Sequence, residues 1–473
     1  MPTLEATAAG FEAAPAAASF AGPASSWVVV VHQRRDVLEL SLAQVREVLR
    51  GAIDDWRDLG GAPGAIRVLA PDSDAAAIAG ALGLSELRAG RLEATDVANR
   101  VEGDIGAFGL VRPEALRPGL LALVVDGYDP YRDPAVASPL REPTGAPPAF
   151  DPVLLVATGE IIPARCTNAA LERLDDYDAM FEDVGPLLER ADIALTALEV
   201  PLSDVGPPTP CLETFNMLGS PRAADAIAHS GIDVVSMVGN HMLDCWGGCS
   251  GRAAMLDTVE RFRAEGIETV GAGANLEAAR TPALVTIDST PPMTFAFLAY
   301  DTIQPTYHST AEAAGITGYD RASMTEDIER AREQADTVVV SMNWGIEYTA
   351  KPTAFQLEAA RAALDAGATL VIGNHPHWVQ ALEVSSGGDA LVAYALGNLV
   401  FDQDWSRETT ESAILEASFV DGRLIGYRLR PAVLRGLPGA PAGLYRPELV
   451  DPASEGRPIL GRIWEATDAL APR

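Results

Sequence analysis

Two short segments with nearly the same wording place histidine directly after an apolar run. Val371–His377 (VIGNHPH) carries His375 and His377, and Val234–His241 (VVSMVGNH) carries His241. The chain has six histidines, so half of them fall in these two segments. Imidazole is the commonest metal ligand in proteins and the usual acid–base group near neutral pH. The repeated Gly-Asn-His wording therefore predicts a metal or acid–base site at two strand ends.

Carboxylates and amides follow other predicted strands in the same way. The predicted strands and the polar residues after them are Pro152–Thr158 before Glu160, Ile193–Leu198 before Glu199, Asp233–Val238 before Asn240 and His241, Thr337–Met342 before Asn343, Thr369–Ile372 before Asn374, His375 and His377, and Leu391–Leu396 before Asn398. Ligands of open α/β sheets bind at the carboxyl ends of strands. Carboxylate, imidazole and amide oxygen suit manganese, iron or zinc, and this set is large enough for one or two divalent ions.

Each of these residues has a simpler explanation when it stands alone. A strand-end glutamate is often a solvated charge, an asparagine after glycine usually belongs to a turn, and a single histidine is more often structural. His375 and His377 are harder to explain in this way, because both rings emerge from one tight turn. Taken as a set, the residues favour a metal site.

The elements that position these residues are predicted to form two bodies. Residues 1–26 are rich in Ala, Gly, Pro and Ser and are expected to be a flexible lead-in. Residues 27–138 form a small lobe, and residues 139–152, with five prolines, a linker. Strand and helix patterns alternate over residues 153–473, which indicates an α/β domain.

The remaining expected elements follow from hydrophobic periodicity. In the larger domain, helices are predicted over Ala169–Arg190, Pro221–Ser230, Gly251–Glu265 and Ala354–Ala366, and a further strand over Thr294–Tyr300. In the lobe, strands are predicted over Val28–His32, Ile66–Leu69, Gly103–Val111 and Leu120–Val125, and helices over Ser41–Ile53, with Ser41 as N-cap, and Asp74–Leu82.

Charge and composition exclude several classes of partner. The formal net charge is −31, from 35 basic and 66 acidic residues, so nucleic acid and anionic membrane surfaces would be repelled. No apolar run reaches the roughly 18 residues of a membrane span. The start of the chain lacks a signal-peptide pattern. The four cysteines allow the disulfides Cys166–Cys211 and Cys245–Cys249, but free buried thiols are equally compatible with the sequence.

From about Leu154 to Phe419 the sequence resembles the CapA family, the poly-γ-glutamate capsule-synthesis type within the calcineurin-like metallophosphoesterase superfamily. The matching motifs are Gly159–Arg165, Ala197–Leu202, Asn240–Asp244, Gly271–Gly273, Asn343–Tyr348, Gly373–His377 and Gly397–Asp402. The resemblance implies a four-layer α/β/β/α sandwich with two metals between the sheets.

The resemblance also implies a role for each matching residue. Glu199 would bridge two metals, with Glu160 and His377 completing one and Asn240 and His375 the other. The expected catalytic residues are His241, as a general acid that binds no metal, Asp244, and Arg165. Arg165 would clamp an anionic group of the substrate or merely pair with Glu160. Substrate contacts are expected from Arg165, Asn343, Glu347 and Asn398.

Three departures from the family pattern bear on these roles. Glu160 stands where the family usually has Asp, Ala197 where it usually has Asn, and Asn343 where it usually has His. With an amide oxygen in place of an imidazole nitrogen, the second metal is expected to be bound more weakly, to be a harder ion, or to be absent. Calcium or magnesium then becomes an alternative to manganese, iron or zinc.

The lobe resembles one lobe of phosphate-type periplasmic solute-binding proteins. The resemblance rests on Val28–His32, Ser41–Gly51, Trp56 with Gly60-Gly61, Gly103–Gly106 and Asp126–Pro130. Where that family has a Ser/Thr-Gly anion-binding turn, this chain has Pro71–Ala75 with two aspartates, which would repel phosphate. A structural or docking role is therefore expected for the lobe.

Three functions are compatible with the sequence. The first is a metal-dependent hydrolase or transferase that acts on a polyanionic or peptide-like polymer, with a capsule-synthesis machinery as its partner. The second uses the same site to epimerise a peptide, with His241 as acid or base. The third is a non-catalytic surface module with a degenerate metal site. The resemblance implies an extracytoplasmic or cell-surface location, in conflict with the missing signal peptide.

Overall fold

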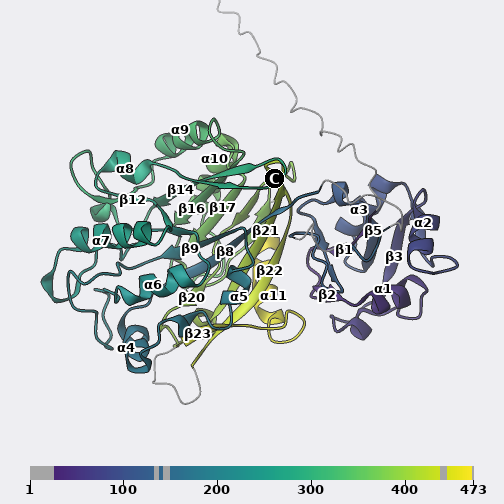
Figure 1. Ribbon diagram of the computed structural model, residues 1–473, viewed down its shortest axis with the longest axis horizontal. Coiled ribbons are helices and arrows are strands. Elements are labelled where there is room, and N and C mark those ends of the chain that lie inside the picture. The colour runs from purple at the N-terminus through teal and green to yellow at the C-terminus, as the bar shows by residue number, and fades with distance from the viewer. Residues whose placement is uncertain (1–25, 133–137, 142–149, 437–444, 471–473) are drawn as a thin grey trace, which may run out of the picture.

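The computed structural model describes residues 26–132, 138–141, 150–436 and 445–470. The lead-in expected over residues 1–26 lies outside these ranges except for Ser26, and residues 142–149 of the expected linker lie outside them too. Two bodies lie side by side along the longest axis of the molecule (Figure 1), a small lobe built from the first part of the chain and a larger body built from the rest.

The lobe contains a five-stranded sheet with its own core. In spatial order the strands of this sheet are β4 (Gly90–Leu92), β3 (Arg67–Pro71), β5 (Ala107–Val111), β1 (Val28–His32) and β6 (Leu120–Ala122). The helices of the lobe are α1 (Leu42–Leu49), α2 (Ala75–Ala81) and α3 (Ala94–Glu102). A short separate ladder pairs β2 (Glu39–Leu40) with β7 (Val124–Val125), and 3-10 turns lie at Trp56–Leu59 and Pro113–Ala115. Helix α1 begins at Ser41 in a capping box with Gln44, as its sequence predicts. Asp74, in the turn that departs from the binding-protein pattern, accepts hydrogen bonds from Trp27 and Arg112.

The larger body contains two sheets. The first has the order β11 (Glu268–Val270), β10 (Val234–Ser236), β9 (Ile193–Leu198), β8 (Val153–Ile161), β21 (Glu411–Val420), β22 (Arg423–Gly436) and β23 (Tyr445–Leu449), with β20 (Asn398–Val400) also pairing β8. The second has the order β13 (Ala283–Ile287), β14 (Met293–Asp301), β16 (Thr337–Asn343), β17 (Leu370–Asn374), β19 (Leu391–Ala393) and β18 (Leu382–Val384). A small ladder joins β12 (Ala272–Gly273) to β15 (Gly315–Ile316).

The two sheets pack face to face, with helices on both outer faces. Successive side chains of a strand point to opposite faces of the sheet, so each central strand contributes side chains to two hydrophobic cores. In β8, Leu155 packs against second-sheet residues such as Phe297, whereas Leu154 packs under the outer helices. Helices α4 (Arg165–Leu174), α5 (Gly185–Leu188), α6 (Arg222–His229) and α7 (Gly251–Ala264) cover the first sheet, and α9 (Arg321–Ala331) and α10 (Ala354–Ala366) cover the second. The remaining elements are α8 (Leu276–Arg280), α11 (Arg457–Asp468), and 3-10 turns at Asp178–Met180, Trp246–Gly248, Pro305–Tyr307 and Glu408–Thr410.

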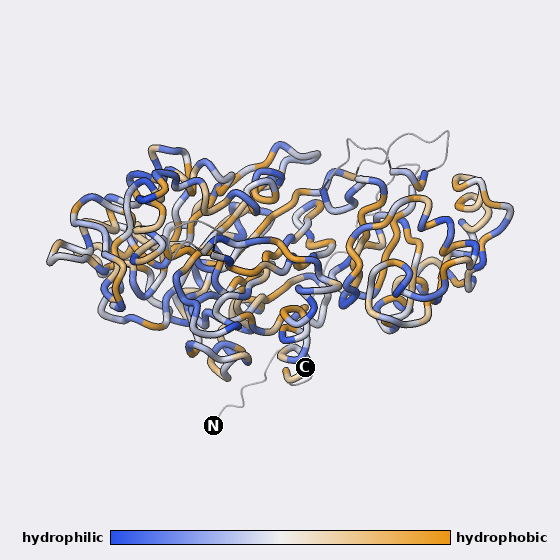
Figure 2. The backbone as a smooth tube through the Cα atoms, turned by 90° about the horizontal axis from the view of Figure 1, so that it is seen from below, coloured by the Kyte–Doolittle hydropathy of each residue, from blue (hydrophilic) through white to orange (hydrophobic). Residues whose placement is uncertain are grey.

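This is the expected four-layer α/β/β/α sandwich. Seen from below, apolar strands run through the interior of both bodies while hydrophilic segments gather at their edges (Figure 2). Apart from the undescribed segments, no helix is long and apolar enough to cross a membrane.

The lobe meets the body at a group of buried charges that we call the junction, formed by Arg428, Asp129, Glu416 and the carbonyl of Ala122. Arg428, on β22, is fully buried and donates to both Asp129 oxygens at 3.0 and 3.1 Å, to Glu416 at 3.1 Å and to Ala122 at 3.1 Å. Burial alone would raise the pKa of the Asp129 carboxyl, but the Arg428 charge outweighs burial and lowers this pKa to about 2. The junction lies beside the middle of β8, where Val156 pairs with Glu416 of β21.

Three sequence predictions about elements are wrong. The helix expected over Ala169–Arg190 ends at Leu174, because Asp175 adopts a left-handed conformation, and only short helical turns follow it. The strand expected over Leu391–Leu396 stops at Ala393, and the chain crosses to the first sheet, where Asn398 begins β20. Leu120–Val125 divides into β6 and β7, which belong to different sheets.

Candidate functional site

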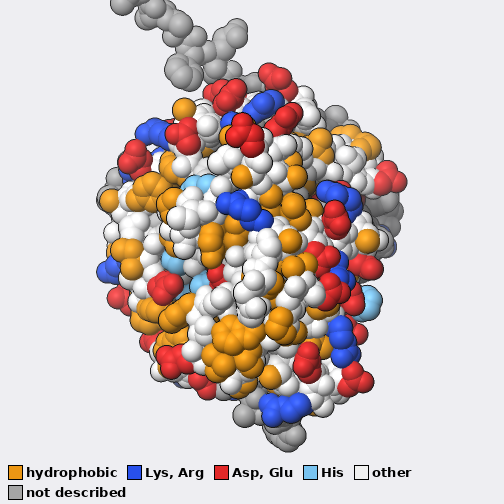
Figure 3. Space-filling model, turned by 90° about the vertical axis from the view of Figure 1, so that its left-hand side faces the viewer, with side chains coloured by type: hydrophobic (Ala, Val, Ile, Leu, Met, Phe, Trp, Pro, Cys, Tyr) orange, Lys and Arg blue, Asp and Glu red, His pale blue; other side chains and the backbone are white. Residues whose placement is uncertain are grey.

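Side chains from both sheets meet at the carboxyl ends of the parallel strands. Glu160 ends β8 and Glu199 follows β9, and both are buried. The turn after β17 carries His375 and His377, which are 5% and 7% exposed. Asn240 follows β10 in the same way. Figure 3 looks onto the end of the body away from the lobe, where histidine side chains show between apolar ones.

Glu160 lies between the two histidines of the turn. Its Oε1 accepts a hydrogen bond from the backbone N–H of His375. Its Oε2 lies 2.7 Å from Nδ1 of His377. No hydrogen bond of good geometry joins these two atoms, and Oε2 is buried without a partner among the described residues. The position of Glu160 is set by β8, which bulges between Ala157 and Glu160 as it pairs with β9.

His375 faces Asn240 on the other side. Its Nδ1 lies 3.0 Å from Oδ1 of Asn240, and the same oxygen accepts a hydrogen bond from Nδ2 of Asn343 at 3.2 Å. The polar atoms of one strand end in the first sheet therefore meet those of two strand ends in the second.

The side chain of Glu199 lies close against the backbone of Gly239. A Cβ on Gly239 would come within 2.6 Å of Oε2 of Glu199, so only glycine fits beside this carboxylate. Oε2 has no hydrogen-bond partner in the described part of the chain. Burial and the neighbouring charge of Glu160 raise the pKa of Glu199 well above its usual value.

Burial and neighbouring charges also shift the pKa values of His375, His377 and Glu160. Burial lowers the pKa of His375 to about 4, and the charge of His377 adds to this effect. For His377, burial opposes protonation, but the Glu160 carboxylate outweighs it and raises the pKa to about 9. For Glu160, burial opposes ionisation, but His377 outweighs it and lowers the pKa. Glu160 and His377 therefore form an ion pair, whereas Glu199 has no cation of its own.

The donor set fits a divalent metal. Donor atoms that share one ion at bond lengths of about 2.1 Å lie roughly 3 Å apart. The Asn240–His375 contact, at 3.0 Å, has this spacing. Unpaired buried oxygens on Glu160, Glu199 and Asn343 add further donors. Within the described ranges, however, no three His, Cys, Asp or Glu side chains form a ready-made metal cluster, so the donors stand in pairs around the centre.

His241 belongs to a separate hydrogen-bonded group. Its Nδ1 lies 2.7 Å from Oδ2 of Asp244. Asp244 also accepts from the backbone N–H of Met217 at 2.9 Å and from the hydroxyl of Tyr307 at 2.7 Å. With Nδ1 held by a carboxylate, Nε2 is the nitrogen that can exchange a proton with a substrate.

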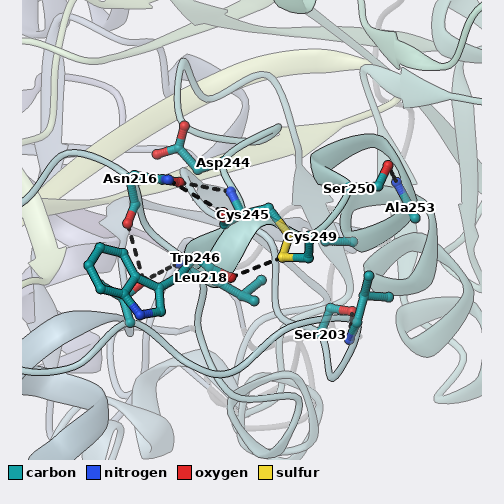
Figure 4. Close-up of a disulfide and its surroundings, with 12 residues drawn as sticks. Ser203, Asn216, Leu218, Asp244, Cys245, Trp246, Cys249, Ser250 and Ala253 are labelled. Carbon is teal, nitrogen blue, oxygen red and sulfur yellow. Dashed lines mark hydrogen bonds between the residues drawn. A yellow bond between two sulfur atoms is a disulfide. The ribbon is translucent and has the colours of Figure 1, made fainter.

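Two disulfides hold the loops beside this group. Cys245, next to Asp244, is bonded to Cys249, and Cys166 is bonded to Cys211. The backbone N–H of Cys245 donates to Asn216 at 2.9 Å, so the first disulfide is fastened to the loop that carries Met217 (Figure 4). All four cysteines are paired, which settles the alternatives that the sequence leaves open.

Arg165 has a different partner from either one expected. Its guanidinium forms a salt bridge with Asp402, at 7% side-chain exposure, and donates to the carbonyl of Thr214 at 3.0 Å. The expected pairing with Glu160 is wrong, because Asp402 follows β20 directly and also accepts from the N–H of Cys166 at 3.0 Å. Arg165 therefore joins three segments of the rim of the site.

Asn343, Glu347 and Asn398, the expected substrate contacts, have different surroundings. Asn343 is 2% exposed and bonded within the site. Asn398 is fully buried, and its Oδ1 lies 2.9 Å from Nδ1 of His377, so it orients that ring. Glu347 is partly exposed, and its charge helps to raise the pKa of Glu199.

Aromatic residues at the rim escaped the sequence prediction. Tyr348 stacks on His377 with ring centroids 5.7 Å apart, and Trp405, which is 58% exposed, meets the edge of Tyr348 at 6.0 Å. Tyr348, His375, His377 and Arg165 all have positive φ angles, although none is glycine. Such conformations cost about 1 to 3 kcal/mol each and cluster at functional sites. Tyr307, Asp301 and Asp402 were also missed, although Asp301 ends a predicted strand as the other site residues do.

Comparison with known proteins places the chain among proteins of capsule synthesis. It is 28% identical over 268 residues to the capsule biosynthesis protein CapA of Bacillus anthracis, covering 55% of this chain and 62% of that one. It is 28% identical to the PGA biosynthesis protein CapA of Bacillus subtilis, covering 54% of this chain and 65% of that one. The chain thus spans less than two thirds of the length of these relatives.

Two solved structures have a weak similarity to this chain. The NAD nucleotidase of Haemophilus influenzae is 9% identical, covering 68% of this chain and 57% of that one, with a TM-score of 0.34. An ABC-type phosphate transport receptor from Vibrio cholerae is 18% identical, covering 22% of this chain and 48% of that one, with a TM-score of 0.22.

The match to a protein family is more extensive. The family described as "Bacterial capsule synthesis protein PGA_cap" matches residues 154–403, which is more than half of the 473 residues and includes every expected site residue. The chain belongs to this family of bacterial capsule synthesis proteins.

Proposed function

We propose that the chain is a metal-dependent hydrolase or transferase that cleaves or transfers a phosphoester or amide group of a polyanionic or peptide-like polymer, in the poly-γ-glutamate class. The names of its relatives, which refer to capsule and PGA biosynthesis, support the substrate class. The two disulfides support an extracytoplasmic location, since oxidised cysteines persist outside the reducing cytosol.

One observation carries the chemical part of the proposal. Four buried or partly buried residues, Glu160, Asn240, His375 and His377, form donor pairs around one centre, and Glu199 brings an unpaired carboxylate to it. A protein core does not leave carboxylate oxygens unpaired without a compensating partner. A divalent cation supplies the missing positive charge.

The metal would be held by Glu160, Glu199, Asn240, His375 and His377, with manganese, iron or zinc as the expected ions. Such an ion lowers the pKa of a bound water and polarises the group under attack. The chain itself orients the donors: Asn398 fixes the His377 ring, and the backbone N–H of His375 fixes Glu160.

His241 would serve as the general acid. Asp244 holds its Nδ1, and Tyr307 and Met217 hold Asp244 in turn, so the imidazole is oriented before substrate binds. Its Nε2 would give a proton to the leaving group, a contribution typically worth about 10²- to 10⁴-fold in rate.

The test compares two histidine substitutions in the full chain. His241→Ala should lower the rate of hydrolysis of poly-γ-glutamate or p-nitrophenyl phosphate by about 10²- to 10⁴-fold. Its manganese content, measured by mass spectrometry after chelation and reloading, should stay the same. His229→Ala is the matched control, because His229 lies on α6 with its side chain 65% exposed and paired only with Asp178.

Other results would redirect the assignment. Loss of metal from His241→Ala would make this residue a ligand. Deuterium uptake from solvent into a peptide without cleavage would identify an epimerase. A wild-type chain that binds no divalent metal and keeps the same stability in chelator would be a non-catalytic module.

A further inference from the structure

Three neighbouring strand ends place Asp301, Asn343 and Asn374 in one row. In the parallel register of the second sheet, Asp301 of β14 pairs with Asn343 of β16, which pairs with Asn374 of β17. All three side chains are buried. Asp301 is a buried carboxylate at the edge of the centre that has no role among the metal donors named above.

The Asp301 carboxylate is fully occupied by hydrogen bonds. Its Oδ1 accepts from Nδ2 of Asn343 at 2.9 Å and from the N–H of Ile303 at 3.1 Å. Its Oδ2 accepts from Nε2 of His308 at 2.9 Å and from the N–H of Gln304 at 2.8 Å. A carboxylate that accepts four hydrogen bonds is fixed in orientation and has few lone pairs left to bind an ion.

His308 is fixed in turn by the backbone beneath it. Its ring lies on Gly318, where a Cβ would come within 2.2 Å of Nδ1. His308 also forms a bridge with Ile316, and Asp301 forms one with Gly318. The imidazole therefore keeps Oδ2 of Asp301 occupied, and Oδ1 remains the atom that meets Asn343.

The fixed carboxylate of Asp301 determines which end of the Asn343 amide stays free. Nδ2 of Asn343 donates to Asp301 and to Oδ1 of Asn240. A flipped amide would put its oxygen against two other oxygens, so this orientation is the favoured one. Oδ1 of Asn343 is left buried and without a partner among the residues described. It is a carbonyl donor beside the Asn240–His375 pair.

We infer that Asp301 and His308 are positioning residues that present the Asn343 carbonyl to a metal ion held with Asn240 and His375. This half of the centre is then richer in oxygen than a site with an imidazole at position 343. Oxygen ligands suit manganese and magnesium, whereas imidazole suits zinc. The inference rests on the proposed function, because it requires that the centre binds a metal.

The test measures metal affinity, which does not depend on an activity assay. Chelator-treated wild-type chain and the Asp301→Asn variant are titrated with manganese, and separately with zinc, by calorimetry. In Asp301→Asn the amide of residue 301 has one acceptor in place of two, so in either orientation its NH2 group faces another donor, either Nδ2 of Asn343 or the N–H of Gln304. The manganese affinity of the Asn240–His375 half should fall about 10- to 100-fold, the usual cost of losing an outer partner of a ligand. Binding at the Glu160–His377 half should persist and shows that the variant is folded.

Two further variants make the result specific. The exchange Asp301→Asn with Asn343→Asp reverses the hydrogen bond and should restore manganese binding, because residue 343 again presents an oxygen. Asn343→His should shift the preference of this half from manganese to zinc. If Asp301→Asn binds manganese with the same affinity as the wild type, the inference is overturned and the proposed function still stands. A wild-type chain that binds neither metal would overturn both.

Discussion

The junction and the proposed metal centre bury charge in opposite ways at two places along β8. At the junction, Arg428 is bonded to both Asp129 and Glu416, and only its Nε lacks a partner among the described residues. At the centre, histidines are the counter-charges of Glu160 and Glu199, and each carboxylate keeps one oxygen without a hydrogen bond among the described residues. On β8, Val156 pairs with Glu416 of the junction, and Glu160 of the centre follows four positions later.

The difference shows which region is built for stability. Arginine is always charged and has five donors in a fixed plane, so it satisfies two buried carboxylates without any ligand. Histidine has two ring nitrogens and loses its charge near neutral pH. Under the proposed function, the centre made from histidine and glutamate is completed by a cation, whereas the junction is complete when the chain folds.

The strongest way to break this contrast is to remove the guanidinium. Arg428→Met leaves Asp129 buried without the arginine that it accepts from, whereas Glu416 loses one of three arginine partners and keeps Arg190 and Arg430. We expect the free energy of unfolding to fall by about 3 to 5 kcal/mol, measured by urea denaturation, with no change in metal affinity. Arg321→Met is the control, because its pair with Glu358 is exposed and should contribute at most about 1 kcal/mol. Equal losses in both variants would contradict the assignment of the junction.

Metal addition should affect the proposed centre and not the junction. Manganese at about 100 times its dissociation constant should raise the free energy of unfolding by about 2.7 kcal/mol. Glu199→Gln removes the carboxylate that burial and Glu160 disfavour, so this variant should be more stable than the wild type without metal. The same variant should gain less from manganese. Thermal denaturation with and without the ion measures both effects, and a less stable metal-free variant would count against an unpaired Glu199.

Acid should weaken the junction selectively. The pKa of Asp129 is lowered from 3.8 to about 2, so its ionised form is favoured by folding. This contribution is fully present above pH 3.8 and is lost as the pH falls towards 2. The loss amounts to about 2 kcal/mol. The stability difference between wild type and Asp129→Asn should shrink over this interval, and a constant difference would refute the ion pair.

Alkali should weaken the metal-free centre instead. The pKa of His377 is raised from 6.5 to about 9, so its protonated form is favoured by folding. This contribution is fully present below pH 6.5 and is lost as the pH rises through 9. Chelated wild-type chain should lose stability over this range, measured by denaturant titration at each pH. His377→Gln should show a flatter profile, and equal slopes would argue against the Glu160–His377 ion pair.

The sequence predicted the centre better than it predicted the connections. Glu160, Glu199, Asn240 and His375 follow buried strands of the α/β alternation, and the structure brings all four together. Strand ends can be recognised from local hydrophobicity, and parallel sheets collect such ends at one edge. Their roles as metal ligands remain a proposal.

The partners of these residues depend on contacts that the sequence does not encode locally. Arg165 was expected near Glu160, but its partner Asp402 is 237 positions away. Asn398 was expected after the strand Leu391–Leu396, whereas that strand stops at Ala393 and the chain crosses to the first sheet before Asn398. Disulfide pairing and the break of α4 at Asp175 likewise depend on tertiary packing.

The position of β8 has a consequence for the order of events during synthesis. It lies between β9 and β21, and β21 begins at Glu411, about 250 positions after β8. Until the ribosome has released that segment, one edge of β8 is open, and Asn398 and Asp402 cannot yet hold His377 and Arg165. Strand pairings of this sequence separation form late and slowly. Metal binding at the proposed centre would therefore follow completion of the sheet, after a stage in which the newly made chain has an open strand edge.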